Sequence, residues 1–235
     1  MTEFSMITVR PYETLGTMNI GWLDAHYHFS FANYHDDNYM GLGPLRVIND
    51  DTVKVGGGFD PHPHRDMEII TYVREGAITH KDSLGNEGIT FAGDVQVMSA
   101  GTGITHGEWN KEGEDTRLYQ IWIHPRNRGN APRWETRAFP QESEGLKLLV
   151  SGNKGDDALY IDSDAAIWGG HIAEGKTHEQ HLTGAAYLLV SKGNVTANGQ
   201  VLKAGDGAQL VNEKKLLLAA NTPSEVLLID LPGVQ

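Results

Sequence analysis

Residues 56–73 read Gly-Gly-Gly-Phe-Asp-Pro-His-Pro-His-Arg-Asp-Met-Glu-Ile-Ile-Thr-Tyr-Val and carry the strongest structural signal in the chain. They pass from a glycine-rich turn through a His-Pro-His segment into a run rich in β-branched residues. Because proline fixes φ and lacks a backbone donor, the two prolines indicate an edge strand or a barrel rim. In an extended segment residues i and i+2 point to one face, so His62 and His64 are expected side by side.

Short runs of β-branched, aliphatic and aromatic residues recur along the rest of the chain, separated by Gly, Asn and Asp. Three examples are Leu118–Ile123, Tyr187–Val190 and Val226–Ile229. Apolar spacing typical of helices longer than two turns is scarce. Asn198–Gly199 is a dipeptide preferred in two-residue type I′ hairpins. Many short strands separated by turns predict an all-β sandwich or barrel with few short helices.

Two parts of the chain resemble each other at a separation of about half its length. The residues around Gly76 recur around Gly193, and each copy is followed by an Ala-Gly-Asp tripeptide. We interpret this as a duplicated β module, because each copy would then have the size of an ordinary domain. The prediction is two domains, residues 1–125 and 126–235, connected near Pro125–Pro132.

The composition restricts the class of protein. The 235 residues include 31 Asp and Glu against 19 Lys and Arg, which gives a formal net charge of −12. This acidic balance argues against direct nucleic-acid binding, which normally uses a basic surface. No apolar run approaches the ~18 residues of a membrane span, and residues 1–6 lack the pattern of a secretory signal. We therefore expect a soluble, cytoplasmic protein.

The chain has no cysteine but eleven histidines, so metal chemistry would have to use imidazole and carboxylate. Within Gly101–Glu108, His106 and Glu108 stand two residues apart, like His62 and His64. Two such strands meeting at a barrel mouth would offer three nitrogens and one oxygen to one ion. The alternative is that these are unrelated core or surface side chains. These ligand types suit several metals, so they do not select one.

The other histidines of the first half have weaker contexts. His26 and His28 share the i, i+2 spacing, but we expect packing or surface positions for them rather than a second metal site. His35 and His80 lie in polar sequence and are predicted to be solvated. His124 precedes a proline at a strand end, where a structural role is expected.

A looser group of histidines, His171, His178 and His181, lies near the start of the second module. Aligning the two modules places Leu218 and Ala220 opposite the second pair of candidate ligands. The second half of the chain is therefore predicted to keep only part of a site.

Two segments resemble the motifs of the cupin superfamily. The first motif, G(x)5HxH(x)3E, is matched by Gly56, His62, His64 and Glu68. The end of the second motif, G(x)2H(x)3N, is matched by Gly103, His106 and Asn110. The chain departs from the pattern in two ways. The glycine that closes the first motif stands one residue late, and the usual proline of the second motif is missing.

Within the cupins, the chain resembles the pirin family, which includes bacterial pirin-like quercetin dioxygenases. The similarity is strongest in His62–Glu68, Ser99–Glu108 and Gln120–Ile123, and it covers most of residues 20–125. The C-terminal half resembles the family mainly in architecture. The resemblance implies a bicupin, in which two antiparallel β-barrels of the jelly-roll type pack together.

The resemblance also implies one divalent metal ion per chain, in the N-terminal barrel. The family's ligand pattern falls on His62, His64, His106 and Glu108. Iron as Fe²⁺ is the metal that the family favours, with Zn, Ni, Cu, Mn or Co as alternatives. The implied reaction is opening of a flavonol ring by O₂, with Glu108 as both ligand and base. Phe59 and Met98 are expected near the substrate, a small enolic aromatic compound.

Other functions remain open at this point. Eukaryotic pirin is described as a nuclear, iron-dependent transcriptional coregulator, so the alternative is a non-enzymatic metal-binding regulator that acts through a protein partner. A cupin isomerase or a different oxygenase is a third possibility.

Two carboxylates compete for the fourth ligand position. Most cupins use the glutamate of the first motif, here Glu68, whereas the pirin pattern uses Glu108. We favour Glu108, which leaves Glu68 as a neighbour of the ligands or an ion-pair partner of Arg65 or Arg74.

Overall fold

The computed structural model describes residues 6–139 and 144–234. Within these ranges the chain forms four β-sheets, and helix is limited to two 3₁₀ turns, η1 (Tyr12–Thr14) and η2 (Asp37–Tyr39). The predicted all-β class is confirmed. No helix in these ranges is long and apolar enough to span a membrane.

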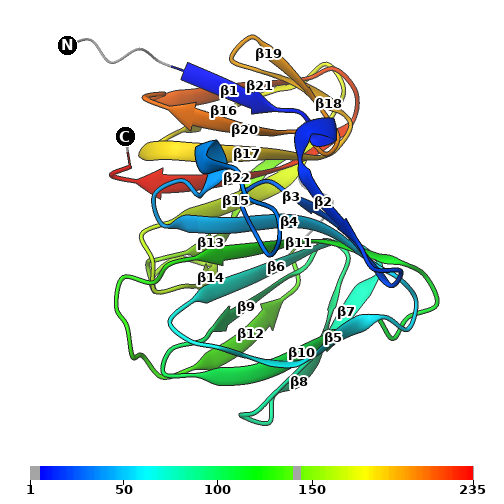
Figure 1. Cartoon of the computed structure of the whole chain (residues 1–235). Helices are drawn as coiled ribbons and strands as arrows, with labels where there is room; N and C mark the ends of the chain where they lie inside the picture. Colours follow the sequence, from blue (N-terminus) through cyan, green and yellow to red (C-terminus); the bar gives the residue numbers. More distant parts are fainter. Residues whose placement is uncertain (1–5, 140–143, 235) are drawn as a thin grey trace.

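The first domain pairs a seven-stranded sheet with a four-stranded sheet (Figure 1). The order of the larger sheet is β12-β9-β6-β11-β4-β3-β2. Its strands are β2 (Gly16–Asn19), β3 (Leu23–Tyr27), β4 (Leu45–Val53), β6 (Glu68–Glu75), β9 (Val95–Ser99), β11 (Thr116–Ile123) and β12 (Arg133–Arg137). The smaller sheet, in the order β5-β10-β7-β8, contains β5 (Gly58–His64), β7 (Ala77–Asp82), β8 (Glu87–Phe91) and β10 (Ile104–Trp109). The His-Pro-His segment therefore lies on an edge strand, as its prolines predict.

The second domain repeats this plan. The order of its larger sheet is β1-β20-β17-β22-β15-β13-β14. These strands are β1 (Met6–Arg10), β13 (Gly145–Ser151), β14 (Leu159–Tyr160), β15 (Ala166–Ile172), β17 (Gly184–Lys192), β20 (Gly207–Val211) and β22 (Ser224–Pro232). The smaller sheet, in the order β16-β21-β18-β19, contains β16 (Thr177–His181), β18 (Asn194–Ala197), β19 (Gln200–Lys203) and β21 (Lys215–Ala220).

Each domain takes one strand from the other half of the chain. β1 pairs with β20 along its whole length, and Figure 1 shows it in dark blue beside the orange strands of the second domain. β12 pairs with β9 and so adds residues 133–137 to the first domain. Each domain therefore contains one strand from the other side of the predicted boundary between residues 125 and 126.

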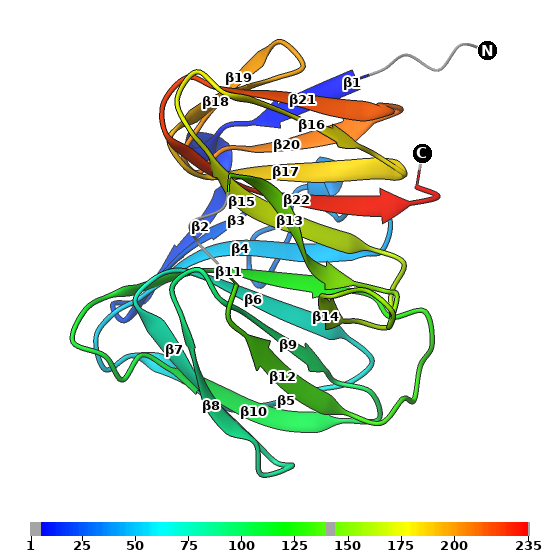
Figure 2. The ribbon, with the colours of Figure 1, turned by 180° about the vertical axis from the view of Figure 1, so that it is seen from behind.

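The two larger sheets share a core. Because side chains alternate along a strand, Ile48, Ile70 and Ile121 of the first domain face the second, where they join a buried cluster that includes Leu227 and Ile229. Figure 2 shows the two larger sheets together from behind. The opposite face of β4, β6 and β11 points into the first barrel, where the candidate site lies.

The predicted repeat is confirmed as a shared turn geometry. The backbone N–H of Ala92 donates to the Gly76 carbonyl at 2.9 Å, and that of Ala204 donates to the Gly193 carbonyl at 3.0 Å. Gly76 and Gly193 have φ values of 72° and 79°, which glycine adopts without a steric penalty. Both residues of Asn198–Gly199 also have positive φ, as a type I′ hairpin requires.

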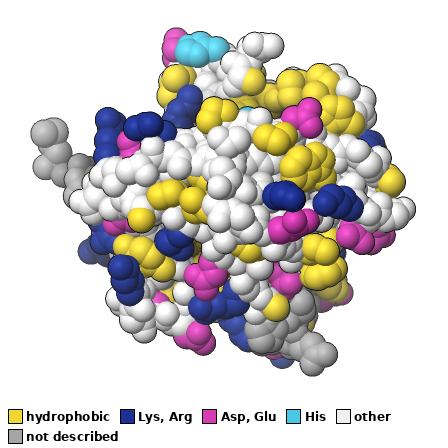
Figure 3. All heavy atoms as spheres, turned by 90° about the horizontal axis from the view of Figure 1, so that it is seen from below, with side chains coloured by type: hydrophobic (Ala, Val, Ile, Leu, Met, Phe, Trp, Pro, Cys, Tyr) yellow, Lys and Arg dark blue, Asp and Glu magenta, His cyan; other side chains and the backbone are white. Residues whose placement is uncertain are grey.

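The charged side chains do not gather by sign on the face seen in Figure 3. Lys and Arg side chains lie among Asp and Glu side chains, and apolar side chains form small separate areas between them.

Candidate metal centre

Two neighbouring strands bring three imidazoles together. His62 and His64 lie on β5, and β10 pairs with β5 so that His106 stands opposite His62. The three ring centroids are 4.6 to 5.0 Å apart. One ring nitrogen of each histidine lies within 4.8 Å of the others. The structure thus brings together three of the four residues selected from the sequence.

Glu108 lies beside this group rather than within it. The pairing of β10 with β5 is irregular between His106 and Glu108: it passes from His62 to Phe59, so β5 has one residue more than β10 in this interval. The pairing of β10 with β7 stays regular from His106 to Trp109, so His106 and Glu108 keep the i, i+2 relation of a strand. Glu108 forms a second potential ligand group with His106 and His80.

Buried polar side chains hold the Glu108 carboxylate in place. Gln120 Nε2 donates to its Oε2 at 3.1 Å, Thr71 Oγ1 donates to its Oε1 at 3.4 Å, and Gln96 Nε2 also donates to Oε1. Burial raises the pKa of Glu108 to about 7, although these three hydrogen bonds act to lower it.

The imidazoles have nitrogens available for a ligand. His62 Nδ1 lies 2.8 Å from the backbone oxygen of Asp60, to which it can donate while Nε2 keeps its lone pair. Among the described residues, His106 Nε2 is buried without a hydrogen-bond partner. A buried ring nitrogen without a partner costs free energy unless an ion or a ligand binds to its lone pair. Three imidazoles with an adjacent carboxylate therefore fit a divalent metal ion.

The electrostatic environment keeps two of these imidazoles neutral, as metal binding requires. Burial, followed by the neighbouring His62, lowers the pKa of His64 to about 4. Burial, followed by His62, His64 and His80, lowers the pKa of His106 to about 2.

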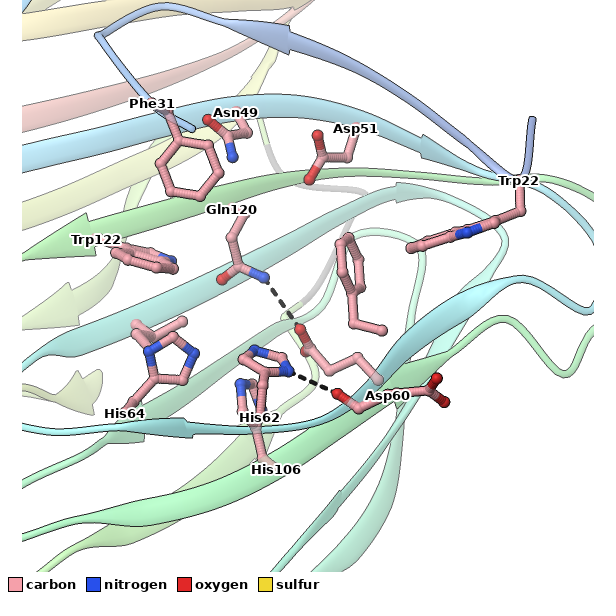
Figure 4. A pocket seen from close by; sticks show the side chains of 13 residues that line it. Trp22, Phe31, Asn49, Asp51, Asp60, His62, His64, His106, Gln120 and Trp122 are labelled. Atoms are coloured by element: carbon pink, nitrogen blue, oxygen red, sulfur yellow. Dashed lines mark hydrogen bonds between the residues drawn. The ribbon is translucent and has the colours of Figure 1, made fainter. Parts of the chain in front are cut away.

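A cavity of about 360 Å³ opens beside the imidazoles. Its aromatic walls are Trp22, Phe31, Phe59 and Trp122. Figure 4 shows His62, His64 and His106 on one side of the cavity and, facing them, Asn49, Asp51 and Gln120. The expectation for Phe59 is therefore confirmed. Met98 does not line the cavity but packs in a buried cluster with Ile69, which is one of the lining residues. A place for Met98 near the substrate therefore stays a prediction.

Asp51 is a buried carboxyl group at this cavity. The residue is only 2% exposed, and its Oδ1 has no hydrogen-bond partner among the described residues. Burial, followed by the charges of Asp50, Glu108 and Asp24, raises the pKa of Asp51 well above its usual value. The fold therefore favours the neutral acid, which has an O–H group to donate to a ligand.

We expect Asp51→Asn to stabilise the protein at neutral pH. The folded state retains the Asp51 proton at pH values where the unfolded chain releases it, so stability is lost as pH rises above the ordinary carboxyl range. An amide does not titrate. The gain in unfolding free energy should therefore be small near pH 4 and about 1 kcal/mol at pH 8. Urea unfolding at both pH values measures it, and an equal effect at both would contradict the neutral acid.

Glu68 lies outside the cavity. β5 ends at His64 and β6 begins at Glu68, and Asp66 between them has a φ of 48°, so the side-chain alternation does not continue across this segment. Glu68 Oε2 accepts a hydrogen bond from Ser99 Oγ at 2.5 Å and lies 4.0 Å from Arg133 Nη2. The ion-pair partner is thus Arg133, rather than either of the arginines expected from the sequence.

His80 is buried, so the prediction that it is solvated is wrong. It stands opposite Glu108 in the pairing of β7 with β10, and its ring stacks on Trp134 with centroids 4.8 Å apart. Polar neighbours in the sequence do not reveal this position, because the covering ring comes from a strand more than fifty residues away. The i, i+2 spacing of His80 and Asp82 was the sequence signal that could have indicated a role for His80.

The other histidines of the first half lie apart from the centre. His28 is buried with Nδ1 3.0 Å from the Tyr187 hydroxyl oxygen, and His26 stacks on Tyr12. The packing positions expected for both are confirmed. His35 is exposed, as predicted. The exposed His124 follows β11, and its structural role stays a prediction.

The second domain offers no comparable centre within residues 6–139 and 144–234. Potential ligand groups in these ranges occur only in the first domain, so His171, His178 and His181 do not converge. Leu218 and Ala220 are buried in the apolar cluster that fills the second barrel.

We therefore expect one tightly bound divalent metal ion per chain. The second barrel has the apolar Leu218 and Ala220 in place of two of the four candidate ligands, His106 and Glu108, so its ligand set is incomplete. Metal analysis of extensively washed protein measures the ratio. Two ions per chain would show that the C-terminal histidines bind one of them.

Comparison with known proteins gives one family match for each domain. Residues 8–123 match the Pirin family model, and residues 148–231 match the model described as Quercetinase C-terminal cupin domain. These matches confirm the predicted pair of cupin domains.

Relatives match the chain along nearly its whole length. A Caulobacter vibrioides protein named pirin-like protein is 49% identical over 230 residues, 96% of this chain and 99% of the relative. An Escherichia coli K12 protein named quercetin 2,3-dioxygenase is 44% identical over 232 residues, 97% of this chain and 100% of the relative. The crystal structure of a bacterial pirin from E. coli in complex with nickel(II) superposes with a TM-score of 0.93 at 43% identity, covering 97% of this chain and 100% of the other.

Proposed function

This chain belongs to the pirin family, and from this premise we propose that it is a metal-dependent dioxygenase that opens a flavonol ring with O₂. The observation that carries the proposal is the convergence of three imidazoles on a cavity with aromatic walls. The relative named quercetin 2,3-dioxygenase supports the substrate class and the reaction. The nickel complex of the E. coli pirin supports a divalent ion in this fold.

Four side chains would hold the ion. His62, His64 and His106 would bind it through ring nitrogens, and Glu108 beside them would supply a carboxylate oxygen. The same donors accept Fe²⁺, which we favour, and also Zn, Ni, Cu, Mn or Co. The chemistry that the ion supplies when bound is Lewis-acid polarisation of a substrate oxygen.

The cavity walls would orient a flat aromatic substrate. Trp22, Phe31 and Trp122 offer ring faces and edges for stacking, and a volume of about 360 Å³ suits a small aromatic compound. Asp51, on the side opposite the imidazoles, would hydrogen-bond a hydroxyl or carbonyl oxygen of the substrate. Glu108 would accept the proton of the substrate's reacting hydroxyl at a carboxylate oxygen.

Oxygen uptake tests the proposal. Protein purified without oxygen and loaded with Fe²⁺ is mixed with quercetin, and O₂ consumption is followed together with flavonol absorbance. We expect saturable uptake that matches the loss of flavonol. Absence of uptake by metal-replete protein across a panel of enolic aromatics would contradict the dioxygenase and favour a non-enzymatic metal-binding protein.

A further inference from the structure

Three side chains form a continuous line that ends at the candidate metal centre. His80 Nε2 lies 3.1 Å from Asp82 Oδ2, and His80 Nδ1 lies 3.4 Å from His106 Nδ1. The side chains of His80 and Asp82 are both fully inaccessible to solvent. β7 carries His80 and Asp82 and pairs directly with β10, which carries His106.

We propose that His80 is a positioning residue that orients His106 for metal binding, and that Asp82 in turn orients His80. The inference rests on the proposed function, because it assigns His106 to the metal ion. It adds two residues that the ligand pattern of the sequence leaves out.

The chemistry of the three groups fixes the direction of the hydrogen bonds. The Asp82 carboxylate accepts from the backbone N–H of Leu84 at 2.9 Å and from Asn86 Nδ2 at 2.9 Å, so it acts as an acceptor toward His80 as well. His80 therefore carries its proton on Nε2 and has a lone pair on Nδ1. The hydrogen between His80 and His106 must then come from Nδ1 of His106.

This arrangement leaves Nε2 of His106 free to bind a metal ion. With its proton on Nδ1, His106 has a lone pair on Nε2, the buried atom that lacks a hydrogen-bond partner among the described residues. Ligating histidines commonly donate their second nitrogen to a fixed acceptor, which sets both the tautomer and the orientation of the ring. Here that acceptor is a second imidazole.

The surroundings keep His80 from turning. Its ring lies nearly parallel to that of Trp134, with an interplanar angle of 8°. Because the position is closed to solvent, water cannot replace a lost hydrogen bond, and the loss carries its full cost.

Nickel(II) affinity, measured by competition with a chelator, tests the inference in three His80 variants. The side-chain oxygen of asparagine reaches about the position of imidazole Nδ1, so His80→Asn keeps an acceptor for His106. Glutamine places its amide nitrogen near Nε2 and keeps only the contact to Asp82. We expect a loss of about 10–100-fold for His80→Ala and His80→Gln, and affinity close to that of the unmodified protein for His80→Asn.

Two controls separate the explanations. Trp134→Leu removes the stacking ring and the hydrogen bond from Trp134 Nε1 to Gln96 Oε1 but keeps both hydrogen bonds of His80, so its affinity should change less than that of His80→Ala. Asp82→Asn should weaken nickel binding, and it provides a second variant if His80→Ala fails to fold, as thermal unfolding of the metal-free proteins would show.

Several outcomes would overturn the inference. Unchanged affinity in His80→Ala would remove any role for His80. An equal loss in His80→Ala and His80→Asn would indicate that His80 is itself a ligand, in the group that it forms with His106 and Glu108. If the unmodified protein binds no nickel, the proposed metal centre fails and the inference fails with it. A loss of nickel affinity that is confined to the His80 variants leaves the proposed function intact.

Discussion

Glu108→Gln should abolish dioxygenase activity and strongly weaken metal binding, whereas Glu68→Gln should leave the metal bound. The substitution at Glu108 removes the negative charge that would neutralise the ion and the oxygen that would accept the substrate proton. We expect activity to fall by about 10²–10⁴-fold, the range for loss of a positioned proton acceptor. Glu68 lies outside the cavity against Ser99 and Arg133, so its loss should reduce activity by at most about 10–100-fold.

Glu68 is a matched control, because both glutamates are 2% exposed and hydrogen-bonded. A general effect of changing a buried carboxylate would appear in both variants. Metal content after dialysis and steady-state oxygen uptake measure the two effects separately. A ranking in which Glu68→Gln loses metal and Glu108→Gln retains it would exclude the pirin-type ligand set and favour that of other cupins.

His64→Ala should lose most of the bound metal and all metal-dependent activity while the protein stays folded. Its ring lies 4.8 Å from that of His62 and 5.0 Å from that of His106, so its removal takes one nitrogen from the converging group. Three donors would then remain for an ion that needs four or more. The fold should persist because the buried core of the barrels, rather than the ion, supplies most of the stability.

Metal analysis, oxygen uptake and thermal unfolding of the metal-free proteins test this prediction together. His35→Ala is the matched control, since His35 is exposed and lies apart from the centre. Gross unfolding of His64→Ala, with a normal control, would mean that the imidazole or its ion has a structural role.

Local patterns were sufficient to predict the strand-rich class, the repeated turns and the shared face of His62 and His64, whereas the ligand set that adds His106 came from the resemblance to the pirin family. Side-chain alternation and turn chemistry depend on a few adjacent residues, so one sequence contains the necessary information. The same rule fails for Glu68, because the segment that joins its strand to that of His64 is irregular. The left-handed Asp66 interrupts the alternation between His64 and Glu68, and it has no decisive signal in the sequence.

Contacts between distant segments were beyond prediction for a different reason. His80 becomes buried only because Trp134 covers it, and Glu68 meets Arg133 only because β12 joins the first domain. These pairings depend on tertiary packing, which composition and spacing do not specify. For the same reason, the sequence repeat did not reveal that the two domains exchange β1 and β12.

That exchange ties the folding of the two barrels together. A fragment that ends at residue 125 would expose the unpaired edge of β9 and would leave His80 without its covering indole. A fragment that starts at residue 126 would likewise lack the outer neighbour of β20. The first barrel needs residues 133–137 and the second needs residues 6–10, so neither completes its hydrogen bonding when the chain is cut at residue 125. The whole chain is therefore expected to melt as one cooperative unit.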